Sequence, residues 1–164
     1  MTIMIYNAHN QRIPTLSDLQ KNLKYALNDV FGTMLGRSPE IFDEAELVTG
    51  LSAIVGFGGN ISGFLALHSK PENACEMAGV MLGMRFSAVD DIVCDAMGEV
   101  VNMLAGGLKK YSSSNGELFK VSIPSIVWGS SYSTCAPRNS EQVLIGVKSF
   151  DSLFTVQLVV TTNY

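Results

Sequence analysis

The change of hydrophobic period along the chain most constrains its fold. Apolar residues from Leu16 to Met34 recur at three- and four-residue steps, which is the spacing of one helix face. A hairpin-like pair of strands follows, then two more helical stretches, and after residue 118 only strand-like segments remain. Because the helices are grouped rather than alternating with single strands, this order predicts an α+β fold with a mostly antiparallel sheet.

Capping and turn residues predict where the elements begin and end. The predicted helix limits are Thr15 with Asp18 and Gly36 for the first helix, Ser69 with Glu72 around Pro71 for the start of the second, and Ser87 with Asp90 and about Lys110 for the third. The predicted strands are Leu51–Val55 and Ile61–Leu67 around a Gly-rich turn at 56–60, then Leu118–Ile123, Ser125–Trp128, Gln142–Phe150 and Leu153–Thr162, with Asp151 and Ser152 as the last turn.

Composition narrows the class of protein. The 164 residues suit a single domain over 1–164, and at 47% hydrophobic and 16% charged the chain is suited to a buried core rather than disorder. A net charge of −4 and scattered basic residues argue against a nucleic-acid binder. The N-terminus lacks a signal-peptide pattern, and no apolar run approaches the roughly 20 residues of a membrane span. The three cysteines are widely spaced, which predicts buried thiols and a cytoplasmic location.

The third helix carries the most informative surface. At about 100° per residue, Val93, Met97 and Val100 fall on one side. The opposite side gathers four residues within a sector of about 60° by the same arithmetic. These four are Asp95, Glu99, Asn102 and Gly106. Periodicity alone is also compatible with an ordinary solvated helix face.

Two features set this face apart from an ordinary one. The helix contains three glycines, Gly98, Gly106 and Gly107. Each lowers the stability of the helix by about 1 kcal/mol relative to Ala. Such glycines suit the close approach of another backbone or a bulky group. The face is also nearly bare of Lys and Arg.

The pattern Asp-x-x-Gly-Glu-x-x-Asn-x-x-x-Gly, which runs from Asp95 to Gly106, resembles the signature of the CheX/CheC/FliY phosphatases of bacterial chemotaxis. The first helix, the Gly-rich hairpin and the segment from Val121 to Gly129 are also similar to this family, so the resemblance covers most of the chain. CheC-type members carry the motif twice. Here the second helix has Glu76 but Gly79 where an Asn is needed, so the resemblance favours CheX, with one site.

The resemblance implies a CheC-like fold and a hydrolase that removes the aspartyl phosphate of a CheY-like receiver domain. Asn102 would orient the attacking water, and Glu99 would pair with the receiver's lysine. Asp95, Gly98 and Gly106 are the candidates for partner contact, although Asp95 also suits a local structural role. The chain would bring no cofactor of its own, and the receiver would supply Mg²⁺. The family also implies a homodimer in which sheets or an exchanged strand join the chains, and the strand Leu153–Thr162 could supply that edge.

Other functions remain open at this stage. The same fold, as the resemblance implies, occurs in the flagellar switch protein FliM, so a non-catalytic binding module is the main alternative. Asp95 and Glu99 have the spacing of two metal ligands, but no third ligand is evident, and His68 is expected at the rim of a strand. Cys135 has no nearby histidine for nucleophilic catalysis. The glycines from Gly56 to Gly59 lack the Lys and Ser/Thr of a phosphate loop.

Overall fold

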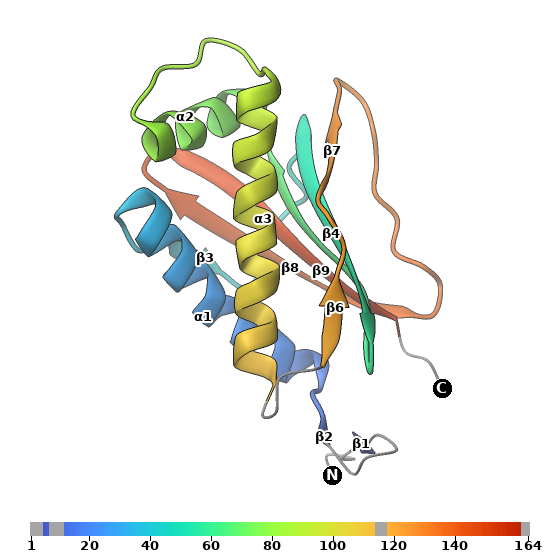
Figure 1. Cartoon of the computed structure of the whole chain (residues 1–164). Helices are drawn as coiled ribbons and strands as arrows, with labels where there is room; N and C mark the ends of the chain where they lie inside the picture. The colour runs from blue at the N-terminus through green and yellow to red at the C-terminus, as the bar shows by residue number, and fades with distance from the viewer. Residues whose placement is uncertain (1–4, 7–11, 114–117, 162–164) are drawn as a thin grey trace.

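The computed structural model describes residues 5–6, 12–113 and 118–161 (Figure 1). The three helices are α1 (Leu16–Leu35), α2 (Pro71–Leu82) and α3 (Asp91–Ser112). The strands are β1 (Ile5–Tyr6), β2 (Arg12–Ile13), β3 (Glu40–Phe42), β4 (Leu51–Gly59), β5 (Ser62–Ser69), β6 (Phe119–Val121), β7 (Ser125–Trp128), β8 (Ser140–Ser149) and β9 (Ser152–Thr161). No helix in these described ranges is long and apolar enough to cross a membrane.

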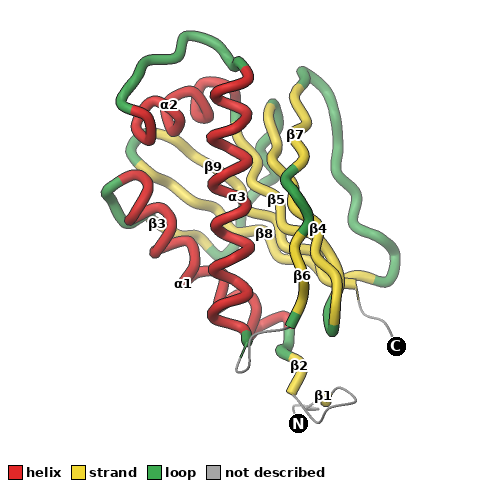
Figure 2. The backbone as a smooth tube through the Cα atoms, in the orientation of Figure 1, coloured by secondary structure: helices red, strands yellow, loops and turns green. Residues whose placement is uncertain are grey.

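Seven strands form one antiparallel sheet in the order β3-β8-β9-β5-β4-β6, and β7 also pairs with β4. The predicted hairpin is β4–β5, with Leu51 opposite Ser69 and Phe57 opposite Gly63. The three helices lie on the same side of the sheet (Figures 1 and 2). The α+β class with an antiparallel sheet is therefore confirmed.

The core lies between the helices and this covered face of the sheet. Alternation along β9 turns Phe154, Val156 and Leu158 toward the helices, and all three are buried. Phe154 meets Phe31 of α1 edge to face, with ring centroids 5.9 Å apart. Met97, Val100 and Leu104 of α3 belong to the same buried core cluster, so α3 also rests on apolar side chains.

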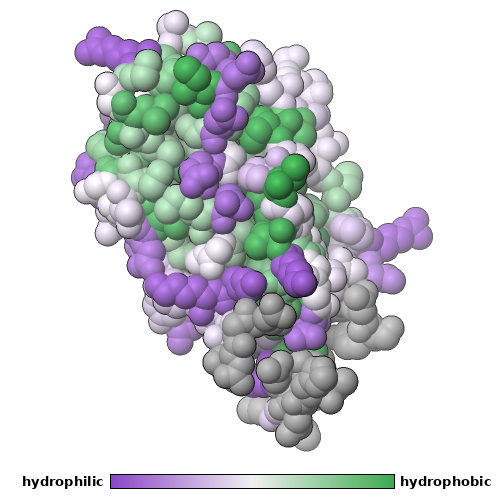
Figure 3. Space-filling view, viewed as in Figure 1, coloured by the Kyte–Doolittle hydropathy of each residue, from purple (hydrophilic) through white to green (hydrophobic). Residues whose placement is uncertain are grey.

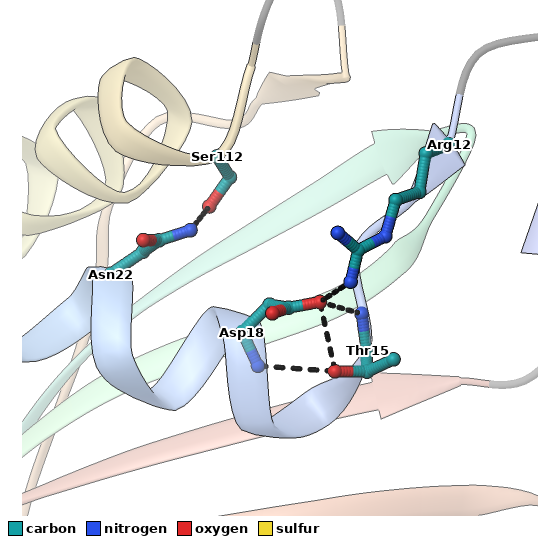
Figure 4. A network of polar contacts seen from close by, with 5 residues as sticks. All are labelled: Arg12, Thr15, Asp18, Asn22 and Ser112. Carbon is teal, nitrogen blue, oxygen red and sulfur yellow. Dashed lines mark hydrogen bonds and ion pairs between the residues drawn. The ribbon is translucent and has the colours of Figure 1, made fainter. Parts of the chain in front are cut away.

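Helix α1 begins at the predicted capping box (Figure 4). The Asp18 N–H donates to Thr15 Oγ1 at 3.2 Å, and the Thr15 N–H donates to Asp18 Oδ2 at 3.0 Å. Arg12 adds an ion pair to the same Asp18 oxygen at 2.9 Å. Farther along α1, Asn22 donates to Ser112 Oγ at 3.1 Å, which ties α1 to the last residue of α3. Gly36, with φ of 67°, ends α1 as predicted.

Two sequence predictions of local structure were wrong. Lys70, not Ser69, is the N-cap of α2, and it makes no side-chain cap bond because a lysine side chain has no hydrogen-bond acceptor. Ser69 Oγ donates to the Lys70 carbonyl instead of capping the helix. The glycines from Gly56 to Gly59 belong to strand β4, which is paired through them with β5 and β6, so the hairpin turn is shorter than predicted.

The last strand also occupies a different place from the one expected. Strand β9 pairs with β8 on one side and with β5 on the other along most of its length. Its backbone groups are thus already used, and the prediction that this strand offers a free edge for joining two chains was wrong. The turn before it is formed at Phe150 and Asp151 rather than at Asp151 and Ser152, and Phe150 has φ of 54°.

The face of the sheet away from the helices carries a buried polar network. His68, expected at a strand rim, is fully buried there between Ser52, at 2.6 Å from Nδ1, and Gln157, at 3.1 Å from Nε2. Tyr132 and Thr134, from the segment after β7, bond to Ser52 and Gln157 respectively. The network therefore holds that segment against the sheet.

Candidate functional site on helix α3

Helix α3 begins at a side-chain cap. Asp90 is extended, and its carboxylate accepts a hydrogen bond from the Val93 N–H at 2.9 Å. Asp91 lies in the first turn, and Lys109 and Lys110 lie in the last, where each charge complements the helix dipole. Asp90, rather than Ser87, is the N-cap, so this part of the prediction is confirmed for Asp90 alone.

One side of α3 is buried along its length. Val93, Met97, Val100 and Leu104 are all at most 1% exposed. Because these residues fix the rotation of the helix about its axis, they also decide which residues face outward. The inward face is the one that the valine and methionine spacing predicts.

The opposite side is open to solvent. Asp95, Glu99, Asn102 and Gly106 are all exposed, as the helical spacing predicts. Within the described ranges, the side chains of Asp95, Glu99 and Asn102 make no hydrogen bond or ion pair. Glu99 and Asn102 are three residues apart, hence about 60° apart around the axis and about 4.5 Å along it. A carboxylate and a carboxamide thus stand side by side with their hydrogen-bonding capacity unused.

The glycines of α3 have different surroundings, and one departs from the prediction. Gly98 is buried, and a Cβ placed there would lie 3.5 Å from Pro124 Cβ. The group that approaches Gly98 is therefore this chain's own β6–β7 connection, so its assignment as a partner-contact residue was wrong. Gly107 likewise faces Ala26 of α1, whereas a Cβ on Gly106 would meet no atom within 4 Å.

Helix α2 does not carry a second copy of the site. Its Glu76 carboxylate accepts a hydrogen bond from Ser152 Oγ, which ties it to the start of β9. A Cβ at Gly79 would lie 2.8 Å from the Met84 carbonyl oxygen, where the chain leaves the helix. The Glu and Gly of α2 thus have structural uses at their own positions.

The alternative chemistries gain no geometric support from the described residues. These ranges hold no group of three or more His, Cys, Asp or Glu side chains placed to share a metal ion. The cysteines are free, and only Cys75 is buried, while Cys135 is exposed, so the prediction of buried thiols holds for one of the three. Burial, and then the nearby carboxylates of Asp91 and Asp95, raise the pKa of Cys94, which keeps that thiol protonated.

The surface around α3 is divided into a hydrophilic part and a hydrophobic part. A hydrophilic strip follows the exposed side of the helix, and hydrophobic surface adjoins it over the side where β6 and β7 run (Figure 3). The exposed acids Asp91, Asp95 and Glu99 make the strip negative. Such a surface suits a partner that presents positive charge beside apolar side chains.

Comparison with known proteins agrees with this geometry. Residues 51–148, more than half of the 164, match the family model described as Chemotaxis phosphatase CheX. The CheY-P phosphatase CheX of Thermotoga maritima is 28% identical over 92 residues, which cover 56% of this chain and 59% of that relative. The chain thus matches less than two thirds of that relative's length.

Solved structures show the same fold. A CheC-like superfamily protein from Shewanella sp. PV-4 is 21% identical, with a TM-score of 0.77 over 90% of this chain and 100% of the other. The CheX-CheY-BeF3-Mg²⁺ complex from Borrelia burgdorferi contains a chain that is 19% identical, with a TM-score of 0.76 over 88% of this chain and 98% of that one. The fold is CheC-like, and the chain belongs to the CheX family of chemotaxis phosphatases.

Proposed function

We propose that this protein hydrolyses the aspartyl phosphate of a CheY-like receiver domain, with Asn102 and Glu99 as its catalytic residues. The observation that carries the proposal is that both side chains are exposed, unpartnered and about one turn apart on α3. Family membership supports it, as do a relative named a CheY-P phosphatase and a structural neighbour solved in complex with CheY.

Asn102 orients the attacking water in this proposal. A carboxamide is not a useful base, but it both donates and accepts hydrogen bonds, and at Asn102 neither capacity is used within the described chain. Holding a water in line with phosphorus removes part of the entropy of bringing the reactants together, a contribution with a ceiling of roughly 7–11 kcal/mol. The glutamine that positions water in GTPases has the same chemistry.

Glu99 recognises the partner rather than the transferring group. A carboxylate repels an anionic phosphoryl group, so its favourable contact is with a cation, which in this proposal is the receiver's lysine beside the phosphorylated aspartate. Asp95 and Gly106 lie on the same exposed side of α3, Asp95 adding negative charge and Gly106 leaving room for close approach. Both are proposed contacts with the receiver.

The metal ion belongs to the partner in this proposal. Mg²⁺ bound by the receiver neutralises the phosphoryl oxygens. This chain contributes Glu99 and Asn102 to a site in which the receiver already provides the phosphorylated aspartate, the lysine and the Mg²⁺. In this proposal, neither a metal ligand nor a covalent nucleophile is required of this chain.

We also propose that the protein is a cytoplasmic homodimer, with sheet edges joining the chains. Since β9 is central, the joining edge has to lie elsewhere. Along β8, strand β3 pairs only with Gly146 to Lys148, and no described strand pairs with Ser140 to Ile145 on that side. This stretch is our candidate edge. Sedimentation that gives a stable monomer at micromolar concentration would reject the dimer.

The phosphatase proposal is tested with a phosphorylated receiver and Mg²⁺, by following loss of the phosphoryl label. The wild-type protein accelerates the loss, Asn102→Ala abolishes the acceleration while binding persists, and Glu99→Ala weakens both binding and turnover. Asn28→Ala on α1 and Glu44→Ala in the β3–β4 connection are matched controls, since both residues are exposed away from α3, and they keep wild-type rates. Binding without any acceleration by the wild-type protein would instead identify a docking module.

A further inference from the structure

The most exposed large apolar side chain in the described ranges lies in the connection between β6 and β7. Ile123 is 85% exposed, compared with 59% for Trp128, the next in order. Val121, two residues earlier, is also exposed. Single exposed apolar residues are common, so exposure alone gives Ile123 no role.

The backbone around Ile123 is anchored on both sides. The Ser122 N–H donates to the Gly56 carbonyl at 2.8 Å, and the Gly56 N–H donates to Ser122 Oγ at 3.0 Å. Ser122 Oγ in turn donates to the Ile123 carbonyl at 3.0 Å. On the other side, Pro124 packs against Gly98 and restricts the backbone of the residue before it. Ile123 is therefore presented from a fixed backbone, and little ordering entropy is lost when a partner covers it.

This anchor places Ile123 beside the proposed catalytic pair. Pro124, the next residue in the chain, contacts the helix at Gly98, which immediately precedes Glu99. Figure 1 shows the β6–β7 connection running alongside α3, and in Figure 3 hydrophobic surface borders the polar strip there. A partner that reaches Glu99 and Asn102 from solvent therefore arrives next to Ile123.

We infer that Ile123, with Val121 beside it, forms an apolar docking contact for the same receiver domain, at the rim of that domain's phosphorylation site. The inference rests on the proposed function. Covering an aliphatic side chain stabilises the complex to a similar extent before and during the reaction, because the contact takes no part in the bond changes at phosphorus. Ile123 is thus a binding and positioning residue, and it acts on Kd and KM rather than on kcat.

The test compares Ile123→Asp and Ile123→Ala with Leu153→Asp. Leu153 is a comparable control because it is 46% exposed and lies on the sheet face away from the helices. Affinity is measured for a receiver loaded with BeF3⁻ and Mg²⁺, and KM and kcat are measured with the phosphorylated receiver. Ile123→Asp is expected to raise Kd and KM about 10-fold or more, and Ile123→Ala by a smaller factor, while kcat at saturation changes less than about twofold.

The outcomes separate the inference from the function on which it rests. If both Ile123 variants bind the receiver with unchanged Kd and turn it over at the wild-type rate, the docking role is overturned and the phosphatase proposal still stands. A wild-type protein without any effect on the receiver would refute both. If Ile123→Asp changes the sedimentation of the free protein but leaves its affinity for the receiver unchanged, the surface serves self-association instead. Thermal unfolding of each variant checks the fold, and if Ile123→Asp is unfolded, Ile123→Ala decides.

Discussion

Two adjacent glycines of α3 allow the packing of the helix to be tested with one substitution at two sites. A Cβ at Gly106 meets nothing within 4 Å, whereas a Cβ at Gly107 would lie 2.7 Å from Ala26 Cβ and 3.3 Å from Ala26 Cα. The first position faces solvent, and the second lies where α1 crosses α3. Changing each glycine to alanine adds the same methyl group to the same helix.

The two substitutions have opposite expected signs. Replacing a mid-helix Gly by Ala gains about 1 kcal/mol of helix propensity. At Gly106 that gain is unopposed, so the melting temperature rises by roughly 2–4 °C for a chain of this size. At Gly107 the gain is opposed by overpacking against Ala26, which costs about 1–3 kcal/mol. The net change there is between zero and about 2 kcal/mol of destabilisation.

Thermal and urea unfolding of Gly98→Ala, Gly106→Ala and Gly107→Ala measure these differences. Gly98→Ala is the intermediate case because its Cβ would make ordinary contact with Pro124 at 3.5 Å, so it is expected to be neutral or stabilising. A Gly107→Ala protein as stable as Gly106→Ala would refute the close α1–α3 contact. If Gly106 contacts the receiver, Gly106→Ala also raises Kd for the receiver in spite of its greater stability.

Three further predictions concern the scaffold. Thr15→Ala removes the side-chain half of the capping box and should lower the free energy of unfolding by about 1 kcal/mol in urea titrations, with Ser17→Ala as a neutral control. Burial lowers the pKa of His68 below its usual 6.5, so the stability that its neutral form contributes is complete above pH 6.5 and declines as the pH falls toward the lowered value; unfolding at stepped pH and NMR titration of the ring check this. Gly63→Ala should prevent normal folding or cost several kcal/mol, because its Cβ would lie 1.9 Å from the Val159 carbonyl oxygen across the β5–β9 ladder; circular dichroism and urea unfolding measure it. An unchanged Gly63→Ala protein would contradict this strand register.

The exposed stripe of α3 was predictable because helical periodicity is local. Once Val93, Met97, Val100 and Leu104 face inward, Glu99 and Asn102 must face outward, and the structure shows this arrangement. The role of Gly98 was not predictable in the same way. Its neighbour Pro124 is 26 positions away in the sequence, and only the tertiary fold brings the two together.

Strand neighbours were the main failure of sequence reasoning. The length and apolar character of Leu153–Thr162 predict a strand, but they do not say whether it lies at an edge or in the centre of the sheet. A strand whose residues are buried on both faces is typical of a central position, and β9 is buried from Phe154 to Val160. Thr155 and Gln157 interrupt the apolar residues of this stretch, so only Leu158 to Val160 signalled burial on both faces.

His68 shows a second limit. A single histidine at the end of an apolar strand looks like a rim residue, because its partners Ser52 and Gln157 come from two other strands, and Tyr132, which bonds to Ser52, comes from a third segment. The exposed position of Ile123 was missed for a related reason. Its alternation with Val121 suggests an ordinary strand, while the anchoring of Ser122 to Gly56 is visible only in the folded chain.

The central claim is that a single carboxamide on the surface of α3 places the attacking water. The most direct measurement is single-turnover hydrolysis of a phosphorylated receiver at saturating Asn102→Ala protein, together with the Kd of the variant for the BeF3⁻-loaded receiver. We expect the rate to fall about 100-fold or more while Kd changes less than about threefold, because water placement acts in the transition state. A rate near that of the wild type, or a loss explained entirely by weaker binding, would contradict the mechanism.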